Sequence, residues 1–85
     1  MMVSFAQHPF NPSTEIKFSV EQTGRATLQV YNMLGQLVAP LFQDVVEAGY
    51  YQTVRFNGTN LASGVYLYRL QSGKKSDLKK LLLLK

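Results

Sequence analysis

The stretch NLASGVYLYRL, residues 60–70, leads from a loop into a strand and carries the pattern that decides the fold. Leu61, Gly64 and Tyr66 have the spacing of a tyrosine corner, in which a tyrosine hydroxyl bonds a backbone group a few residues upstream. We expect the glycine to allow close backbone approach, the leucine to cover the core and the tyrosine to bury its ring. The alternative is that Tyr66 and Tyr68 are plain strand aromatics. Extended segments on both sides favour the corner, which would fix a loop between two sheets.

Alternation of apolar and polar residues predicts six strands around this loop. They cover residues 14–20, 25–32, 36–42, 50–57, 65–71 and 78–84. The first two are expected to form an antiparallel hairpin across the turn between them. Pro40 indicates that the third is an edge strand or contains a bulge. Six or seven short strands, with turn residues between them, predict an all-β fold, an antiparallel β-sandwich.

The composition is that of one small folded domain. The 85 residues are 46% hydrophobic and 16% charged, the opposite of a disordered tail. With no cysteine, the chain has no disulfide, thiolate nucleophile or cysteine-bound zinc. No apolar run approaches the roughly 18 residues that span a bilayer. The start lacks the features of a signal peptide, so we expect a cytosolic protein or a piece of a longer precursor.

No arrangement of residues predicts catalysis, a metal site or a cofactor. His8 is the one histidine, and no acidic residue lies close to it in the sequence. Ser13 and Ser63 lack the surroundings of a nucleophile. The acidic residues are scattered singly, without the spacing of a metal site: Glu15, Glu21, Asp44, Glu47 and Asp77. We therefore expect a protein that is not an enzyme.

Basic and aromatic residues could form a nucleic-acid surface if they shared one face. Arg55 and Arg69 lie in predicted strands, as do Tyr66 and Tyr68. Strand alternation, however, places Arg69 on the face opposite both tyrosines. The pattern therefore favours a sandwich core with a solvated arginine, and no nucleic-acid partner is expected.

The end of the chain, KKLLLLK, residues 79–85, is harder to explain as part of a core. Successive side chains of a strand point to opposite faces, so four consecutive leucines place two on each side. If Leu81 and Leu83 enter the core, Leu82 and Leu84 face outward and form a contact surface. The alternatives are a strand covered on both faces or a short helix. An exposed edge strand also invites self-pairing, so we expect a homodimer or strand-exchanged oligomer of the isolated domain.

Four motifs in order, PFNPSTEIKFSV, VYNMLGQLV, NLASGVYLYRL and KKLLLLK, resemble the type A C-terminal sorting domain of the type IX secretion system. The resemblance covers Pro9 to Lys85 and implies an Ig-like β-sandwich. It implies that residues 9–85 form the sorting domain and that residues 1–8 are a linker or an added remnant. The PFNPST segment falls on Pro9 to Thr14, directly after that linker.

The resemblance further implies a non-catalytic domain that directs an upstream cargo protein to the cell surface. Its partners would be the export machinery and a sortase-like peptidase at the outer membrane, reached through the periplasm. The alternative is a structural Ig-like spacer, or a module that binds carbohydrate or protein. The terminal motif of the family falls on Lys79, Lys80, Leu82 and Lys85. We expect partner recognition by the whole segment, namely Lys79, Lys80, Leu81, Leu82, Leu83, Leu84 and Lys85.

Overall fold

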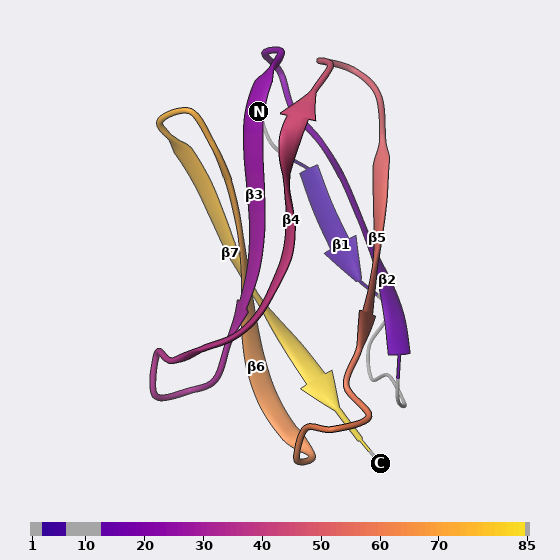
Figure 1. Ribbon diagram of the computed structural model, residues 1–85, viewed down its shortest axis with the longest axis vertical. Coiled ribbons are helices and arrows are strands. Elements are labelled where there is room, and N and C mark those ends of the chain that lie inside the picture. The colour runs from indigo at the N-terminus through magenta and orange to yellow at the C-terminus, as the bar shows by residue number, and fades with distance from the viewer. Residues whose placement is uncertain (1–2, 7–12, 85) are drawn as a thin grey trace.

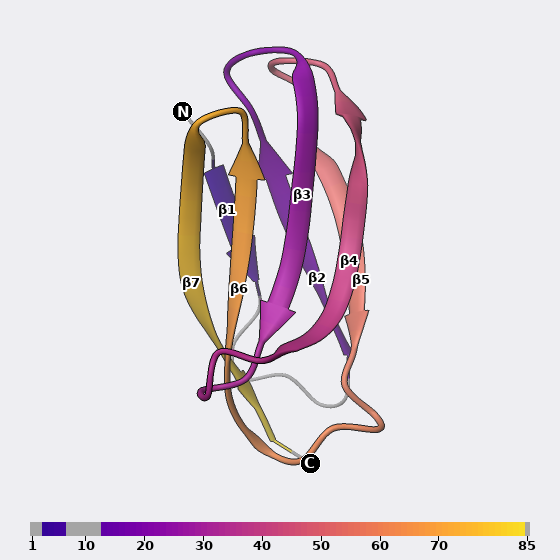
Figure 2. The ribbon, with the colours of Figure 1, turned by 60° about the vertical axis from the view of Figure 1, so that its left-hand side comes forward.

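The computed structural model describes residues 3–6 and 13–84, which fold into seven antiparallel strands in two layers (Figures 1 and 2). The strands are β1 (Val3–Ala6), β2 (Ser13–Ser19), β3 (Gly24–Tyr31), β4 (Leu37–Val46), β5 (Gln52–Asn57), β6 (Gly64–Ser72) and β7 (Lys75–Leu83). One sheet has the order β1-β2-β5 and the other the order β4-β3-β6-β7. The predicted all-β sandwich is confirmed.

The predicted hairpin between β2 and β3 is wrong. β2 pairs with β1 and β5, whereas β3 pairs with β4 and β6, so the turn after β2 carries the chain from one sheet to the other. Both strands bury one face against the same core. Alternation predicts that face, but two strands can share a core either as neighbours in one sheet or across the gap between two sheets.

The sequence analysis predicts a linker at residues 1–8, but these residues include the strand β1. Val3–Ala6 pairs with β2 from Val3 opposite Ser19 to Ala6 opposite Ile16. Four residues are too few to show a period in the sequence, which explains why the strand was not predicted. His8 and residues 9–12 of the PFNPST segment lie outside the described residues, whereas Ser13 and Thr14 begin β2.

The core lies between the sheets and is built from the faces that alternation predicts. The buried side chains include Ile16, Phe18, Val20, Ala26, Leu28, Val30, Phe56, Tyr68 and Leu70. The rings of Phe18 and Phe42 meet edge to face, with centroids 5.4 Å apart and planes at 73°. With no disulfide, this apolar layer supplies the main stabilisation of the fold.

β4 is an edge strand with an irregular register, as Pro40 predicts. The register shifts between Leu28 and Gln29 and again between Val30 and Tyr31, so β4 has an extra residue at each place. The strand continues to Val46, four residues beyond its predicted end at Phe42. Sequence periodicity failed there because the extra residues break the alternation on which the prediction rests.

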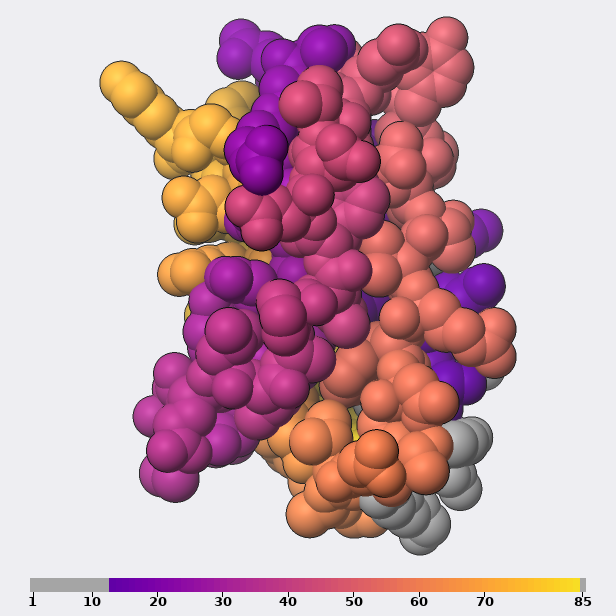
Figure 3. Space-filling model, in the orientation of Figure 1, coloured from indigo at the N-terminus to yellow at the C-terminus, as the bar shows by residue number. Residues whose placement is uncertain are grey.

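The β3–β4 turn is closed by hydrogen bonds to Asn32. Its side-chain oxygen accepts hydrogen bonds from the backbone N–H groups of Leu34 (2.9 Å) and Gln36 (3.0 Å). Gly35 has a φ of 83°, which explains the glycine at this turn. Met33 and Leu34 are 60% and 83% exposed at the tip, which protrudes from the body in Figure 3.

The loop before β6 forms a tyrosine corner. The Tyr66 hydroxyl donates a 2.6 Å hydrogen bond to the carbonyl oxygen of Ala62, and Leu61 packs against the core. Gly64 has a φ of 153°, a conformation that residues with a side chain rarely adopt, yet no atom lies within 4 Å of where its Cβ would stand. The expectation of close backbone approach is therefore wrong, and backbone conformation is the reason for the glycine.

We predict that Tyr66→Phe lowers the free energy of unfolding by about 1–3 kcal/mol, because the ring stays buried while the carbonyl of Ala62 loses its partner. Urea denaturation followed by circular dichroism measures the change. Tyr51→Phe is the matched control, because Tyr51 is 62% exposed and its hydroxyl has no comparable bond in the described part of the chain. Equal stabilities of the two variants would show that the corner contributes nothing.

Candidate functional site

The candidate site is the end of β7, an edge strand of the four-stranded sheet. β7 pairs with β6 along its full length, from Lys75 opposite Ser72 to Leu83 opposite Gly64. Leu81 and Leu83 are fully buried in the core, whereas Leu82 is 37% exposed and Leu84 is 45% exposed. The predicted division of the leucines between two faces is confirmed, and the segment is neither a helix nor enclosed on both sides.

The tyrosine corner and the C-terminal strand support each other. Leu81 lies directly opposite Tyr66 in the ladder, and Leu83 lies opposite Gly64. The corner therefore sets the position of β6 against which the inward leucines pack. Because successive side chains alternate, fixing the inward pair also fixes the direction of the outward Leu82 and its neighbour.

The lysines of the segment are exposed but lie on different sides of the sheet. Lys80 stands opposite Leu67, on the outward face that also carries Leu82. Lys79 stands opposite the buried Tyr68. It therefore lies on the inward side of the sheet, the side from which Leu81 and Leu83 enter the core. Lys85 lies outside the described residues. The structure thus brings Lys80, Leu82 and Leu84 together on one surface.

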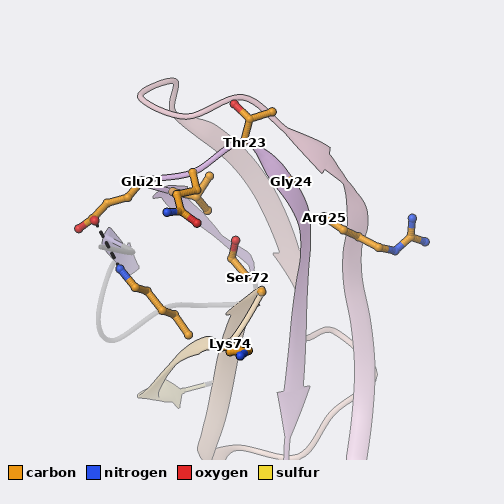
Figure 4. A pocket seen from close by; sticks show the side chains of 10 residues that line it. Glu21, Thr23, Gly24, Arg25, Ser72 and Lys74 are labelled. Atoms are coloured by element: carbon orange, nitrogen blue, oxygen red, sulfur yellow. Dashed lines mark hydrogen bonds and ion pairs between the residues drawn. The ribbon is translucent and has the colours of Figure 1, made fainter.

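A second feature is a hollow between the β2–β3 and β6–β7 turns, at the other end of β7 (Figure 4). Val20 and Ser72 are among its lining residues, and Lys75 at its side pairs with Glu21 at 3.4 Å. Both side chains of this ion pair are more than half exposed, so it contributes little stability. Arg25 points away from the hollow (Figure 4).

The candidates for other chemistry are not brought together. Within residues 3–6 and 13–84, no three histidine or acidic side chains are grouped closely enough to hold a metal ion. Tyr66 and Tyr68 are buried, while Arg55 and Arg69 lie on separate sheets, so they form no shared nucleic-acid surface. The part of the chain that the structure describes holds no helix capable of crossing a membrane.

One polar cluster was missed by the sequence analysis. Arg69 donates hydrogen bonds to the hydroxyl of Tyr31 (2.9 Å) and to the side-chain oxygen of Gln29 (3.4 Å). The guanidinium carbon also lies 5.3 Å from the centre of the Tyr31 ring, within range of a cation–π interaction. Alternation predicts that each of these residues faces outward, but only the pairing of β3 with β6 shows that they meet.

Fold and surface together define a small β-sandwich domain with a partly apolar terminal strand. The family model of the secretion system C-terminal sorting domain matches residues 8–84, and the chain belongs to this family. Such domains are sorting signals of type IX secretion and are in general non-catalytic. The resemblance of the four motifs is thereby confirmed. No curated protein matches the sequence.

We predict that the adjacent leucines differ sharply in their contribution to stability. Leu81→Ala removes a fully buried side chain and should lower the free energy of unfolding by about 2–5 kcal/mol. Leu84→Ala, at a position 45% exposed, should cost less than about 1 kcal/mol. Thermal unfolding of both variants checks the difference, and similar melting temperatures would contradict the observed division between faces.

Proposed function

We propose that the domain directs an upstream cargo protein through the type IX secretion system, and that the export machinery recognises the end of β7. The observation that carries this proposal is the division of the leucines between the two faces of one edge strand. The inward pair anchors the strand in the fold. The outward pair is left for a partner.

The start of β1 and the end of β7 lie at opposite ends of the sandwich (Figure 1). β1 starts at the end that carries the β6–β7 turn, and β7 runs from that turn to the opposite end (Figure 1). A nine-residue strand is roughly 27 Å long. A cargo protein attached upstream of β1 would lie at the first end, so the exposed leucines would remain accessible to the machinery at the other.

The chemistry of the surface indicates what a receptor must supply. A fully buried leucine side chain contributes about 1.5–3 kcal/mol, and Leu82 and Leu84 retain part of that contribution for binding. Lys79 and Lys80 precede the leucines and are exposed. A receptor with apolar contacts flanked by carboxylates would match both features, and the lysines would chiefly raise the association rate.

The proposed route passes through the periplasm to the cell surface or the extracellular space. A sortase-like peptidase at the outer membrane would then remove the domain by cutting between it and the cargo. This step needs an accessible segment before the sandwich. The position of β1 at the end away from the terminal leucines keeps the proposed recognition and cleavage regions apart.

We predict that a periplasmic reporter carrying this domain reaches the surface of a type IX-competent cell. The double variant Leu82→Ser, Leu84→Ser should lower delivery at least tenfold, because the receptor loses its apolar contacts while the inward leucines keep the domain folded. Surface labelling of intact cells measures delivery, and circular dichroism of the purified domain checks folding. Leu34→Ser is the matched control, since this leucine is 83% exposed on the β3–β4 turn, outside the terminal strand.

Undiminished delivery of the folded double variant would contradict recognition through β7. It would favour the alternative, an Ig-like spacer that positions an upstream protein and takes no part in export. Loss of delivery in the Leu34→Ser control as well would show a general requirement for surface leucines, which also contradicts a specific role for the terminal strand.

A further inference from the structure

The outer faces of the two sheets differ in chemistry. In the four-stranded sheet the outward side chains are Arg25, Thr27, Gln29, Tyr31, Leu37, Pro40, Gln43, Val45, Val65, Leu67, Arg69, Gln71, Ser76, Leu78, Lys80 and Leu82. The structure describes all these positions, and none is acidic, whereas arginine and lysine are both present. This face is presented to the viewer in Figure 2.

Apolar residues gather in the half of this face near the end of β7. Tyr31 lies opposite Leu37 on one side and opposite Leu67 on the other, which makes a row across three strands. A second row is formed by Val65 opposite Leu82. The exposed fractions are 50% for Leu37, 39% for Val65 and 37% for Leu82, so these side chains are partly open to solvent.

The outward positions of β2 and β5, in the three-stranded sheet, provide the contrast. They are Ser13, Glu15, Lys17, Ser19, Thr53, Arg55 and Asn57. None of these β2 and β5 residues is apolar, and Glu15 stands opposite Arg55, so unlike charges face each other across the two strands. This is the composition of a solvated face. The apolar rows of the four-stranded sheet therefore have no counterpart on the outer face of β2 and β5.

Arg69 lies beside the apolar rows and is held in place. It is partly buried, and both hydrogen-bond partners that it reaches on β3, Gln29 and Tyr31, are uncharged. Its Nε is buried and has no hydrogen-bond partner in the described structure. On the other side Arg69 faces Leu78, which is 59% exposed. A preorganised guanidinium without a carboxylate partner is suited to bind one.

We propose that this surface docks an acidic protein partner, which places a carboxylate on Arg69 and apolar side chains on the rows beside it. The surface consists of Tyr31, Leu37, Val65, Leu67, Arg69, Leu78 and Leu82, and we call it the Arg69 face. Arginine and tyrosine are the residue types that most often dominate protein interfaces. The proposal goes beyond recognition of the terminal strand, because most of the Arg69 face lies on β3, β4 and β6.

Two other occupants fit the observations less well. A second copy would bring cations against cations, since the face carries no acidic residue to balance them. An anionic lipid surface attracts lysine and arginine without a fixed geometry. It would gain nothing from an arginine oriented by Tyr31 and Gln29. Directional binding of one carboxylate does use that orientation, which favours a protein partner.

The test uses the whole chain and a synthetic peptide that alternates leucine and glutamate, titrated into ¹⁵N-labelled protein by NMR. We expect shifts of amide resonances around Tyr31, Arg69 and Leu78, with β2 and β5 unaffected. A peptide with glutamine in place of glutamate should bind at least tenfold more weakly. Raising the salt concentration should weaken binding of the glutamate peptide and leave the glutamine peptide almost unchanged.

Variants distinguish binding at Arg69 from general attraction of the peptide by the positive charge of the domain. Arg69→Gln should weaken binding of the glutamate peptide about tenfold, the usual effect of losing a charge-assisted hydrogen bond. Arg55→Gln removes the same charge from the opposite sheet and should change affinity less than about twofold. Leu78→Ser alters an exposed side chain, so it keeps the fold and should weaken binding several-fold. Val45→Ser should have no effect, because Val45 is 61% exposed on the half of the sheet away from the apolar rows.

Three results would overturn the proposal. The first is equal weakening by Arg69→Gln and Arg55→Gln, and the second is mapping of the peptide shifts to β2 and β5. The third is binding of phosphatidylglycerol vesicles, or self-association, through the Arg69 face without binding of the glutamate peptide. Each readout uses the purified protein, so failure of this proposal is distinguishable from a failure of export through the end of β7.

Discussion

The structure depends on one constraint: a single apolar layer lies between two sheets, and each strand can offer only alternate side chains to it. In β2, β3 and β6 the constraint is met by simple alternation, with buried residues at every second position. At the end of β7 four leucines are consecutive, at positions 81–84, so they cannot all face the core. Leu81 and Leu83 take the inward places and are fully buried, so Leu82 and Leu84 remain partly exposed.

The tyrosine corner fixes how β6 and β7 meet this constraint. The hydrogen bond from Tyr66 to Ala62 fixes the loop that brings the chain from β5 in one sheet to β6 in the other. Leu81 packs in the ladder opposite Tyr66, so the register of β7 follows from the register of β6. The hydrogen bond at the start of β6 thus helps to fix which leucines of β7 face outward.

Alternation was sufficient to predict most strands, the buried faces and the two-sided nature of the leucine segment. It could not predict which strands are neighbours, and so it placed β2 and β3 in one hairpin although they lie in different sheets. It also missed β1, which is too short to show a period. The cluster of Arg69 with Tyr31 and Gln29 depends on the pairing of β3 with β6, which is a property of topology and not of any local pattern.

The outer faces of the two sheets differ in composition. The outward residues of β2 and β5 are polar or charged, and Glu15 stands opposite Arg55. The four-stranded sheet carries exposed apolar side chains and arginine and lysine at its outward positions, with no acidic residue among them. Its edge strand also holds the terminal leucines. The exposed apolar rows and the terminal leucines therefore lie on the same sheet.

The central claim is that the export machinery touches the outward side of the terminal leucines. Site-specific photo-crosslinking in type IX-competent cells tests it most directly, with a photoreactive residue in place of Leu84 or, as a control, of the exposed Leu34. The account predicts a covalent adduct with an outer-membrane component from position 84, and none from position 34 or in cells that lack the machinery. Adducts of equal yield from both positions, or none from position 84, would contradict it.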